Sequence, residues 1–335
     1  MFQQDTKLQP YNTFGLNVTA KYFASFDSTD RLRLLLQNLP TENFLILGGG
    51  SNLLFTQSYN GTVLRNEVKG IEKVREDEDF VYVKAGGGEV WHNFVLYTID
   101  KGWGGIENLS LIPGSVGASP MQNIGAYGVE IKDVFEELEA YHIPTGEIHT
   151  FTTESCQFGY RESVFKRKLK GQYILLNVTY RLSKKPIVNT RYGAITDELQ
   201  KAGITSPTIK DVSDAVIRIR QSKLPNPAEI GNAGSFFKNP VVEKAILEKI
   251  KVKYPEIPLY PVDDHSVKIP AGWLIEKAGW KGKRFGNYGV HTQQALVLVN
   301  YSDANGKDIF NLSQEIIDSV KSGFGIELER EVNII

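Results

Sequence analysis

The residues best suited to chemistry lie in 109–128, LSLIPGSVGASPMQNIGAYG, which holds four glycines and no charged residue. Glycine lets the backbone approach a ligand closely. Ser115, Ser119, Gln122 and Asn123 supply neutral hydrogen-bonding groups beside exposed backbone N–H. The composition favours a site for a large ligand that carries phosphates. A well-packed crossover loop remains the alternative at this point.

A second glycine cluster follows a short apolar run. Residues 43–47, NFLIL, end in Gly48, Gly49, Gly50, Ser51 and Asn52. A buried strand that feeds such a turn can place several N–H groups against a pyrophosphate. A plain sharp turn fits these residues equally well.

Composition limits the class of protein. With 335 residues the chain is longer than a single core usually supports, so two or three domains are expected. Lys and Arg number 38 against 39 Asp and Glu, so no global field favours nucleic acid or an anionic membrane. The single Cys156 excludes an internal disulfide and every multi-cysteine metal motif, and the five histidines show no ligand spacing. We therefore expect a cytoplasmic protein without a metal, a nucleic-acid partner or a membrane anchor.

The apolar pattern predicts an α+β protein. Residues 89–101 carry apolar side chains at helical spacing, whereas residues 173–182 alternate as in a strand. A boundary is expected near 206–214, where a further helix begins. The other expected elements are strands at 43–47, 62–66, 80–85, 134–141 and 295–301, and helices at 241–254, 271–278 and 308–322.

The last ten residues, 326–335, also alternate. Their apolar residues share one face, and Glu327, Glu329 and Glu331 share the other. This pattern predicts a docked terminal strand, and three carboxylates on one face are usually a solvated edge. The chain contains no dinucleotide fingerprint, phosphate-binding Walker loop, zinc-protease motif or nucleophile elbow.

Several motifs together resemble one enzyme family. They are GGGSN at 48–52, IPGSVGASPMQNIGAYG at 112–128, GYRES at 159–163 and GNAGSFFKNP at 231–240. NTFG, RQSKLPNP and AGWLIEKAG, at 12–15, 220–227 and 271–279, add to them. In this order, and over nearly the whole chain, they resemble the UDP-N-acetylenolpyruvoylglucosamine reductases of bacterial peptidoglycan synthesis.

The resemblance implies a fold and two nucleotide ligands. The fold would be an FAD-binding domain of the vanillyl-alcohol-oxidase type, with subdomains 1–67 and 68–212, followed by a substrate-binding domain, 213–335. The terminal strand 326–335 would return to the active site. FAD is expected to bind non-covalently, because Ser51 and Asn52 stand where many flavin oxidases of that superfamily have a flavin-linked histidine. NADPH would be the co-substrate, and a monomer is expected.

The resemblance also assigns roles to individual residues. Ser235 matches the family's proton donor, Arg161 its carboxylate-contacting arginine and Glu331 its catalytic glutamate. Arg330 stands where relatives often have proline, so Glu329 is the fallback for Glu331. Tyr160, Lys223 and Asn239 match substrate contacts, Tyr192 in NTRYGAI matches the tyrosine of a loop that closes over UDP, and Lys238 is a further candidate contact. The implied FAD contacts are Gly48, Gly49, Gly50, Ser51, Asn52, Ile112, Pro113, Gly114, Ser115, Gly117, Ala118, Gln122, Asn123, Gly125, Ala126 and Tyr127.

Two rival functions stay open at this stage. A flavin oxidase of an alcohol or hydroxy acid would share the fold, although it would more often carry the histidine that this chain lacks at Ser51. A nucleotide-sugar-binding module without flavin belongs to another class. Ser235 alone would be read as a turn cap, Arg161 as a surface ion pair and Lys223 as a solvated lysine.

Overall fold

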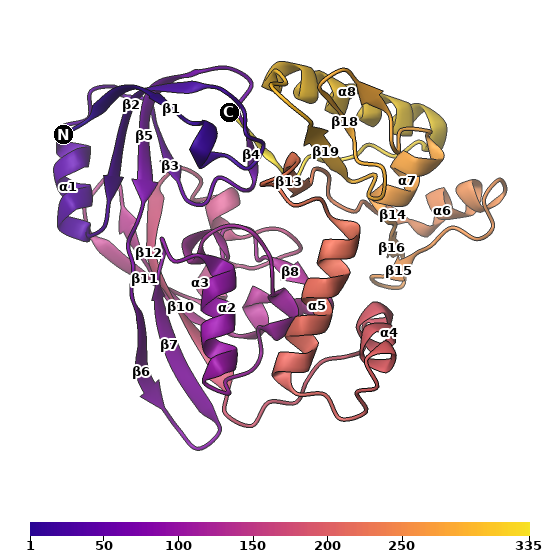
Figure 1. The fold of residues 1–335 in the computed structure, drawn as a ribbon, viewed down its shortest axis with the longest axis horizontal. Coiled ribbons are helices and arrows are strands. Elements are labelled where there is room, and N and C mark those ends of the chain that lie inside the picture. Colours follow the sequence, from indigo (N-terminus) through magenta and orange to yellow (C-terminus); the bar gives the residue numbers. More distant parts are fainter. The chain divides into compact units, whose positions relative to one another are not determined.

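The computed structural model describes all residues from Met1 to Ile335. Two compact units are present (Figure 1). Unit 1 comprises Met1–Thr6, Ala20–Gly49 and Asn60–Ser222. Unit 2 comprises Lys7–Thr19, Gly50–Tyr59 and Lys223–Ile335. The three-part division given above stays a prediction.

Unit 1 contains two larger sheets, each with its own apolar cluster. The first sheet has the order β1-β2-β5-β3, and β3 and β5 are parallel. Helix α1, Thr29–Gln37, packs its buried Leu32 and Leu35 into a cluster that also contains Phe26 and Leu64. The strands are β1 Gln3–Lys7, β2 Thr19–Phe26, β3 Phe44–Leu47 and β5 Tyr59–Asn66.

The second sheet of unit 1 is antiparallel and has the order β11-β10-β12-β7-β6. Its inward face packs against α2, Trp91–Asp100, where the rings of Trp91 and Phe94 lie 5.8 and 5.0 Å from that of Tyr180. Both predicted periodicities are therefore confirmed. The strands are β6 Ile71–Glu76, β7 Phe80–Gly86, β10 Phe135–His142, β11 Ile148–Thr152 and β12 Tyr173–Ser183, and the remaining elements are β8 Gly125–Ala126, β9 Val129–Glu130, α3 Thr153–Cys156, α4 Gly193–Lys201 and α5 Ile209–Lys223.

Unit 2 is built around a sheet of order β13-β19-β18-β17. The longest helix, α8 (Gly306–Phe324), contributes a buried stripe that includes Ile309, Leu312, Ile316 and Val320. A smaller sheet has the order β14-β16-β15. The elements are β4 Leu53–Leu54, β13 Gly231–Ser235, β14 Val241–Glu243, α6 Lys244–Lys251, β15 Tyr260–Pro261, β16 Ser266–Lys268, α7 Ala271–Lys277, β17 Arg284–Phe285, β18 Tyr288–Val290, β19 Val297–Asn300 and β20 Asn333–Ile334.

Two predicted elements of unit 2 need correction. The helix expected at 241–254 begins only at Lys244, because Val241–Glu243 pairs with Ser266–Lys268 as a strand. The terminal segment alternates in burial as predicted, with Ile326, Leu328 and Val332 buried. It forms regular strand pairing only at β20, which runs parallel to β4. Tertiary pairing overrides local propensity in both places.

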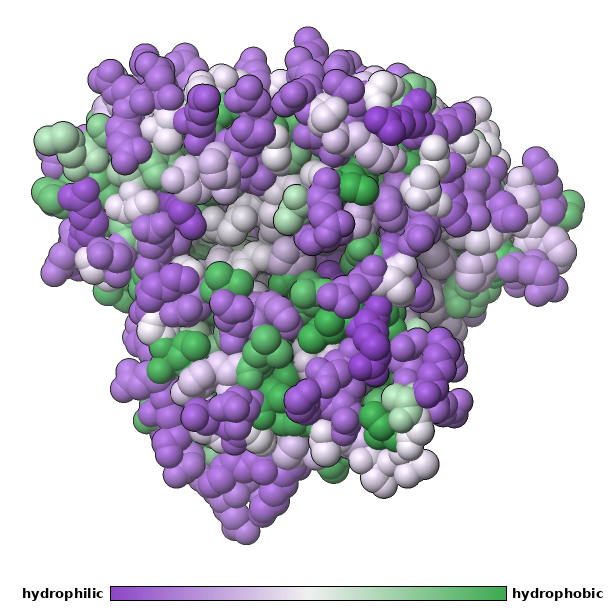
Figure 2. Space-filling view, viewed as in Figure 1, coloured by the Kyte–Doolittle hydropathy of each residue, from purple (hydrophilic) through white to green (hydrophobic).

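No helix of the structure is long and apolar enough to cross a membrane. Among all 335 residues, no group of three or more His, Cys, Asp or Glu side chains is placed to hold a metal ion. On the face drawn in Figure 2, hydrophobic side chains gather only in small groups among hydrophilic ones.

Gly231 shows how closely β13 is packed within unit 2. A Cβ atom there would lie 2.1 Å from the carbonyl oxygen of Phe14. Gly231→Ala should therefore lower the free energy of unfolding by roughly 1–3 kcal/mol, measured by urea denaturation. Gly323→Ala in α8 is the control, because its Cβ would meet nothing within 4 Å. Equal stability of the two variants would contradict this packing.

Candidate active site

The glycine-rich loop 109–128 is fixed to unit 1 by backbone hydrogen bonds at several points. Trp91 N donates to Gly114 O (3.0 Å), and its indole Nε1 donates to Leu109 O (2.9 Å). Gly117 N donates to Gly87 O (2.9 Å), and the hydroxyls of Ser119 and Tyr180 lie 2.7 Å apart. The loop is thus anchored to α2, β12 and the segment that follows β7.

A cavity of about 330 Å³ lies between this loop and the turn after β3. A Cβ on Gly49 would come within 2.8 Å of Gly114 Cα, and one on Gly48 within 2.6 Å of Ser115 Oγ. The two predicted glycine clusters therefore meet in unit 1. The cavity is lined by Asp27, Gly48, Gly49, Arg65, Asn66, Glu67, Lys69, Gly88, Val90, Gly114 and Ser115.

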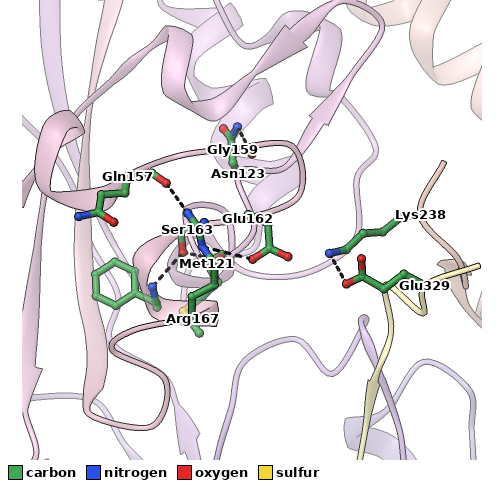
Figure 3. Close-up of polar contacts among 10 residues, drawn as sticks. Met121, Asn123, Gln157, Gly159, Glu162, Ser163, Arg167, Lys238 and Glu329 are labelled. Carbon is green, nitrogen blue, oxygen red and sulfur yellow. Dashed lines mark hydrogen bonds and ion pairs between the residues drawn. The ribbon is translucent and has the colours of Figure 1, made fainter. Parts of the chain in front are cut away.

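Arg161 contacts the same loop. Its Nη2 donates to Gly125 O (2.6 Å), and its guanidinium lies 5.4 Å from the ring centre of Tyr160. Its backbone has a φ of 55°, in the left-handed region. Asn123 Nδ2 donates to Gly159 O (3.1 Å), which joins the loop to the GYRES segment (Figure 3). The carboxylate-contacting candidate is thus held by the candidate cofactor loop.

Tyr192 precedes α4, and its side chain is 42% exposed. Its ring meets that of Tyr127 edge-on at 5.2 Å. The Asn189 carbonyl accepts from Asn108 Nδ2 (2.9 Å), and the same amide donates to Tyr127 O (3.1 Å). The predicted substrate loop therefore rests against the end of the predicted cofactor loop, within unit 1.

Ser235 and Glu331 lie on neighbouring segments of unit 2. Ser235 ends β13 and is paired with Val297, and Gly234 before it has a φ of 69°. Glu331 N donates to Phe236 O (2.9 Å), so the backbone of Glu331 lies beside the residue that follows Ser235. The structure brings together two of the three catalytic candidates within this unit.

Lys238 and Glu329 form an ion pair beside these residues. Lys238 Nζ lies 2.5 Å from Glu329 Oε1 (Figure 3), and Lys238 N donates to Glu329 O (2.9 Å). The lysine side chain is only 9% exposed, whereas that of Glu329 is 68% exposed. Glu329 therefore acts as a counter-ion of a buried lysine.

The side chains of two predicted ligand contacts have structural partners. Asn123 Oδ1 accepts from Lys132 N (3.0 Å), while its amide also donates to Glu130 (3.1 Å). Asn239 Oδ1 accepts from Ala271 N (2.9 Å) at the start of α7. Any contact they make with a ligand must coexist with these bonds.

The other predicted contacts divide between the units. Ile112, Gln122 and Ala126 are half-buried in the loop, Gly117 is buried, and Pro113 and Ala118 are exposed. Gly50, Ser51 and Asn52 belong to unit 2, where Asn52 O accepts from Asn333 Nδ2 (2.8 Å). Lys223 is exposed at the end of α5.

Three cations near the site have no role in the predictions from sequence, although Arg220 begins the motif RQSKLPNP. Arg65 and Lys69 line the cavity, and they pair with Glu67 (3.1 Å) and Glu89 (3.5 Å). Arg220 Nε donates to Leu111 O (3.2 Å) in the loop. Arg220 follows the buried Val216 by four residues and the buried Ser213 by seven. Its place on the apolar stripe of α5 was the available signal.

The whole chain is similar to proteins of known activity. A family model described as the C-terminal domain of UDP-N-acetylenolpyruvoylglucosamine reductase matches residues 226–335, and an FAD binding domain model matches residues 20–152. A UDP-N-acetylenolpyruvoylglucosamine reductase from Flavobacterium johnsoniae is 53% identical over 334 residues, 99% of each chain. The chain belongs to the UDP-N-acetylenolpyruvoylglucosamine reductase family. The resemblance seen in its motifs is thereby confirmed.

Solved structures agree on the fold. The UDP-N-acetylenolpyruvylglucosamine reductase from Thermus caldophilus aligns with a TM-score of 0.67 at 23% identity, covering 100% of this chain and 99% of that one. The 4-ethylphenol oxidase from Gulosibacter chungangensis aligns with a TM-score of 0.52 at 11% identity, covering 94% and 82%. The predicted α+β fold with an FAD-binding domain of the vanillyl-alcohol-oxidase type is confirmed.

The Lys238–Glu329 pair can be tested through stability. Glu329→Gln should lower the free energy of unfolding by roughly 1–2 kcal/mol, less than for a fully buried pair because Glu329 is largely exposed. Adding Lys238→Met should recover most of the loss. Glu327→Gln is the matched control, since its partner Lys321 is itself exposed. Equal effects of the two glutamine variants in urea denaturation would show that the buried lysine does not depend on Glu329.

Proposed function

We infer that the chain catalyses the reduction of UDP-N-acetylenolpyruvoylglucosamine to UDP-N-acetylmuramate in bacterial peptidoglycan synthesis, with FAD as cofactor and NADPH as reductant. The observation that carries this inference is the 53% identity to the Flavobacterium johnsoniae reductase over 99% of both chains.

The residues of unit 1 fit FAD. Gly48 and Gly49 lie so close to Gly114 and Ser115 that neither has room for a Cβ atom, and backbone N–H groups of this wall can meet a diphosphate. Arg65 and Lys69 line the same cavity and are proposed to turn from their carboxylate partners, Glu67 and Glu89, toward the diphosphate when FAD binds. With Ser51 in place of a flavin-linking histidine, the binding is proposed to be non-covalent.

The chemistry that FAD supplies when bound is hydride transfer from NADPH to the enolpyruvyl double bond. Addition at the methylene carbon leaves negative charge spread over the neighbouring carbon and the carboxylate, as an enolate. Positive charge fixed at that carboxylate lowers the barrier most in a water-poor site. Arg161 is proposed for this role, because a guanidinium can bind a carboxylate through two parallel hydrogen bonds. Its bond to Gly125 O fixes one edge of the guanidinium in advance.

Ser235 is proposed to donate the proton that completes the reduction. A hydroxyl is a weak acid, but an enolate carbon is a strong base, and positioned donation satisfies general acid catalysis. Glu331 is proposed to hold a proton when the enolate forms, because an ionised carboxylate would repel it. The backbone bond between Glu331 N and Phe236 O supports this pairing of roles.

Substrate binding is assigned to residues of both units. Tyr160, Tyr192, Lys223 and Asn239 are proposed contacts of the UDP-sugar. Lys238 is proposed to act near Ser235, with its charge maintained by Glu329. A cytoplasmic location and a monomeric state stay predictions.

Two half-reactions followed separately by anaerobic stopped flow provide the first test of the mechanism. Ser235→Ala should leave NADPH-driven flavin bleaching intact and slow reoxidation by the enolpyruvyl substrate by roughly 10²–10⁴-fold, since only protonation needs the hydroxyl. Ser322→Ala, on the exposed end of α8, is the control. Normal reoxidation in Ser235→Ala would remove Ser235 from the proton-donor role.

The same assay separates the two carboxylates. Glu331→Gln should retain the first half-reaction and slow the second by about 10²-fold or more. Glu329→Gln, assayed at a temperature where it stays folded, should slow the second by less than about tenfold. A larger loss in Glu329→Gln would transfer the catalytic role to Glu329.

Purified protein discriminates among the three functions. A flavin spectrum released by acid, together with NADPH-driven reduction of the enolpyruvyl substrate, supports the reductase. Released flavin with alcohol oxidation and no such reduction would indicate an oxidase. Colourless protein that binds UDP-sugar and cannot be reconstituted with FAD would indicate a binding module.

A further inference from the structure

Asn108 is a buried polar side chain to which the proposed mechanism gives no role. It lies in the short helical turn Glu107–Leu109, directly before the glycine-rich loop, and is 1% exposed. Its amide Nδ2 donates to Tyr127 O (3.1 Å) and to Asn189 O (2.9 Å). Its Oδ1 is buried and accepts no hydrogen bond from the protein. The side chain therefore acts only as a donor, through both N–H groups of its amide.

The two carbonyl groups determine which way the Asn108 amide points. A flipped amide would place Oδ1 against two carbonyl oxygens, and acceptors cannot bond to each other. An aspartate or leucine is similar in size to asparagine. The first would bring at most one donor, when protonated, and the second none. The position therefore requires the amide of asparagine if both carbonyls are to be bound.

The carbonyls that Asn108 binds belong to different loops. Tyr127 lies near the end of the glycine-rich loop 109–128, whereas Asn189 begins the predicted substrate loop, residues 189–195. Asn108 itself directly precedes the glycine-rich loop. One side chain thus joins both ends of the glycine-rich loop to the base of the substrate loop, within unit 1.

Asn189 makes the reciprocal contact from the substrate loop. Its Nδ2 donates to Gly128 O (3.2 Å), and its Oδ1 accepts from Arg191 N (3.2 Å). Gly128 has a φ of 81°, and a Cβ atom there would lie 3.5 Å from Asn189 Nδ2. The two loops are therefore bound to each other by two amide side chains, Asn108 and Asn189, which we call the asparagine pair.

These bonds restrain the backbone on which Tyr192 is carried. Arg191, directly before it, donates its N–H to the asparagine pair. On the other side, Thr196 Oγ1 in α4 donates to Thr190 O (2.8 Å). The Tyr192 ring, although 42% exposed, meets that of Tyr127 edge-on at 5.2 Å. A side chain on a backbone that is already fixed loses less conformational entropy when it contacts a ligand.

We propose that Asn108 and Asn189 are positioning residues for substrate binding, which hold the base of the substrate loop so that Tyr192 meets the UDP moiety. Neither asparagine has to touch the substrate in this role. The role rests on the reductase function inferred above and on the assignment of Tyr192 to the UDP moiety. It does not depend on the roles of Ser235 and Glu331.

The test follows flavin reoxidation in the full-length, FAD-loaded chain. Its rate, measured against the concentration of the enolpyruvyl substrate, gives an apparent dissociation constant and a maximal rate constant separately. Asn108→Leu should raise the dissociation constant by about tenfold or more, and Asn189→Ala by about threefold or more. The maximal rate constant should stay within about threefold of the wild type, because the reacting groups are unchanged.

Asn177→Leu is the matched control for Asn108→Leu. Its Oδ1 is also buried without a hydrogen-bonding partner, but its Nδ2 donates to Glu139 (2.6 Å) and to neither loop. The dissociation constant of this variant should stay within about twofold of the wild type.

A double-mutant cycle with Tyr192→Ala separates positioning from a general structural effect. If the asparagine pair acts through Tyr192, adding Asn108→Leu or Asn189→Ala to Tyr192→Ala should change the dissociation constant by less than about twofold. A merely structural role would give the same factor in both backgrounds.

The proposal is overturned if Asn108→Leu and Asn189→Ala both bind the substrate within about twofold of the wild type, or if their effects multiply with that of Tyr192→Ala. It is also overturned if Tyr192→Ala itself leaves the dissociation constant unchanged. If Asn108→Leu fails to fold, the half-buried Asn189 decides the outcome through Asn189→Ala. A wild-type chain that holds FAD but is not reoxidised by the enolpyruvyl substrate would instead overturn the inferred function.

Discussion

The close approach of two backbone turns is the constraint on which unit 1 depends. Gly49 and Gly114 lie so near each other that a Cβ on Gly49 would come within 2.8 Å of backbone. The turn follows β3, and the loop is held by the start of α2, so both elements must be placed before the wall of the cavity exists. A methyl group added at Gly49 would clash with the backbone at Gly114, so the turn or the loop would have to shift.

Unit 2 depends on a comparable contact between distant parts of the chain. The segment around Glu331 pairs with the backbone that follows β13, and β20 continues as a parallel partner of β4. Ser235 and Glu331, nearly a hundred residues apart, are thereby positioned by main-chain hydrogen bonds. Side-chain chemistry at this site is set by backbone register, as is usual where strands carry functional groups.

Much of the architecture could be predicted from local pattern. The alternation of 173–182 and the helical spacing of 89–101 reappear as β12 and α2 because each buries one face on a core. The strand at Val241–Glu243 was not predicted, because its pairing partner, Ser266–Lys268, lies more than twenty residues further along. Non-local pairing of this kind leaves little trace in composition.

The residues of the candidate site were predicted mainly from motifs. The ion pairs and the burial of charged side chains at the site were not predicted. The pairing of Lys238 with Glu329 follows from register and not from spacing in the sequence. Arg220 was given no role, because neither its motif nor its place on a mostly apolar helix face shows which groups surround its guanidinium. Motifs indicate which residues contact a ligand. The burial of a charged side chain and its partners can be seen only in the structure.

The backbone angles of the loop 109–128 bear on the kinetics of ligand entry. Leu111, Asn123 and Tyr127 all have φ near 50°, a conformation that costs a non-glycine residue roughly 1–3 kcal/mol. The unfavourable free energy of these backbone conformations is therefore offset during folding, before any ligand binds. When the protein surface already has its bound conformation, little binding free energy is lost to ordering the protein. Association with unit 1 should then be limited by diffusion and desolvation, with no slow rearrangement of the loop.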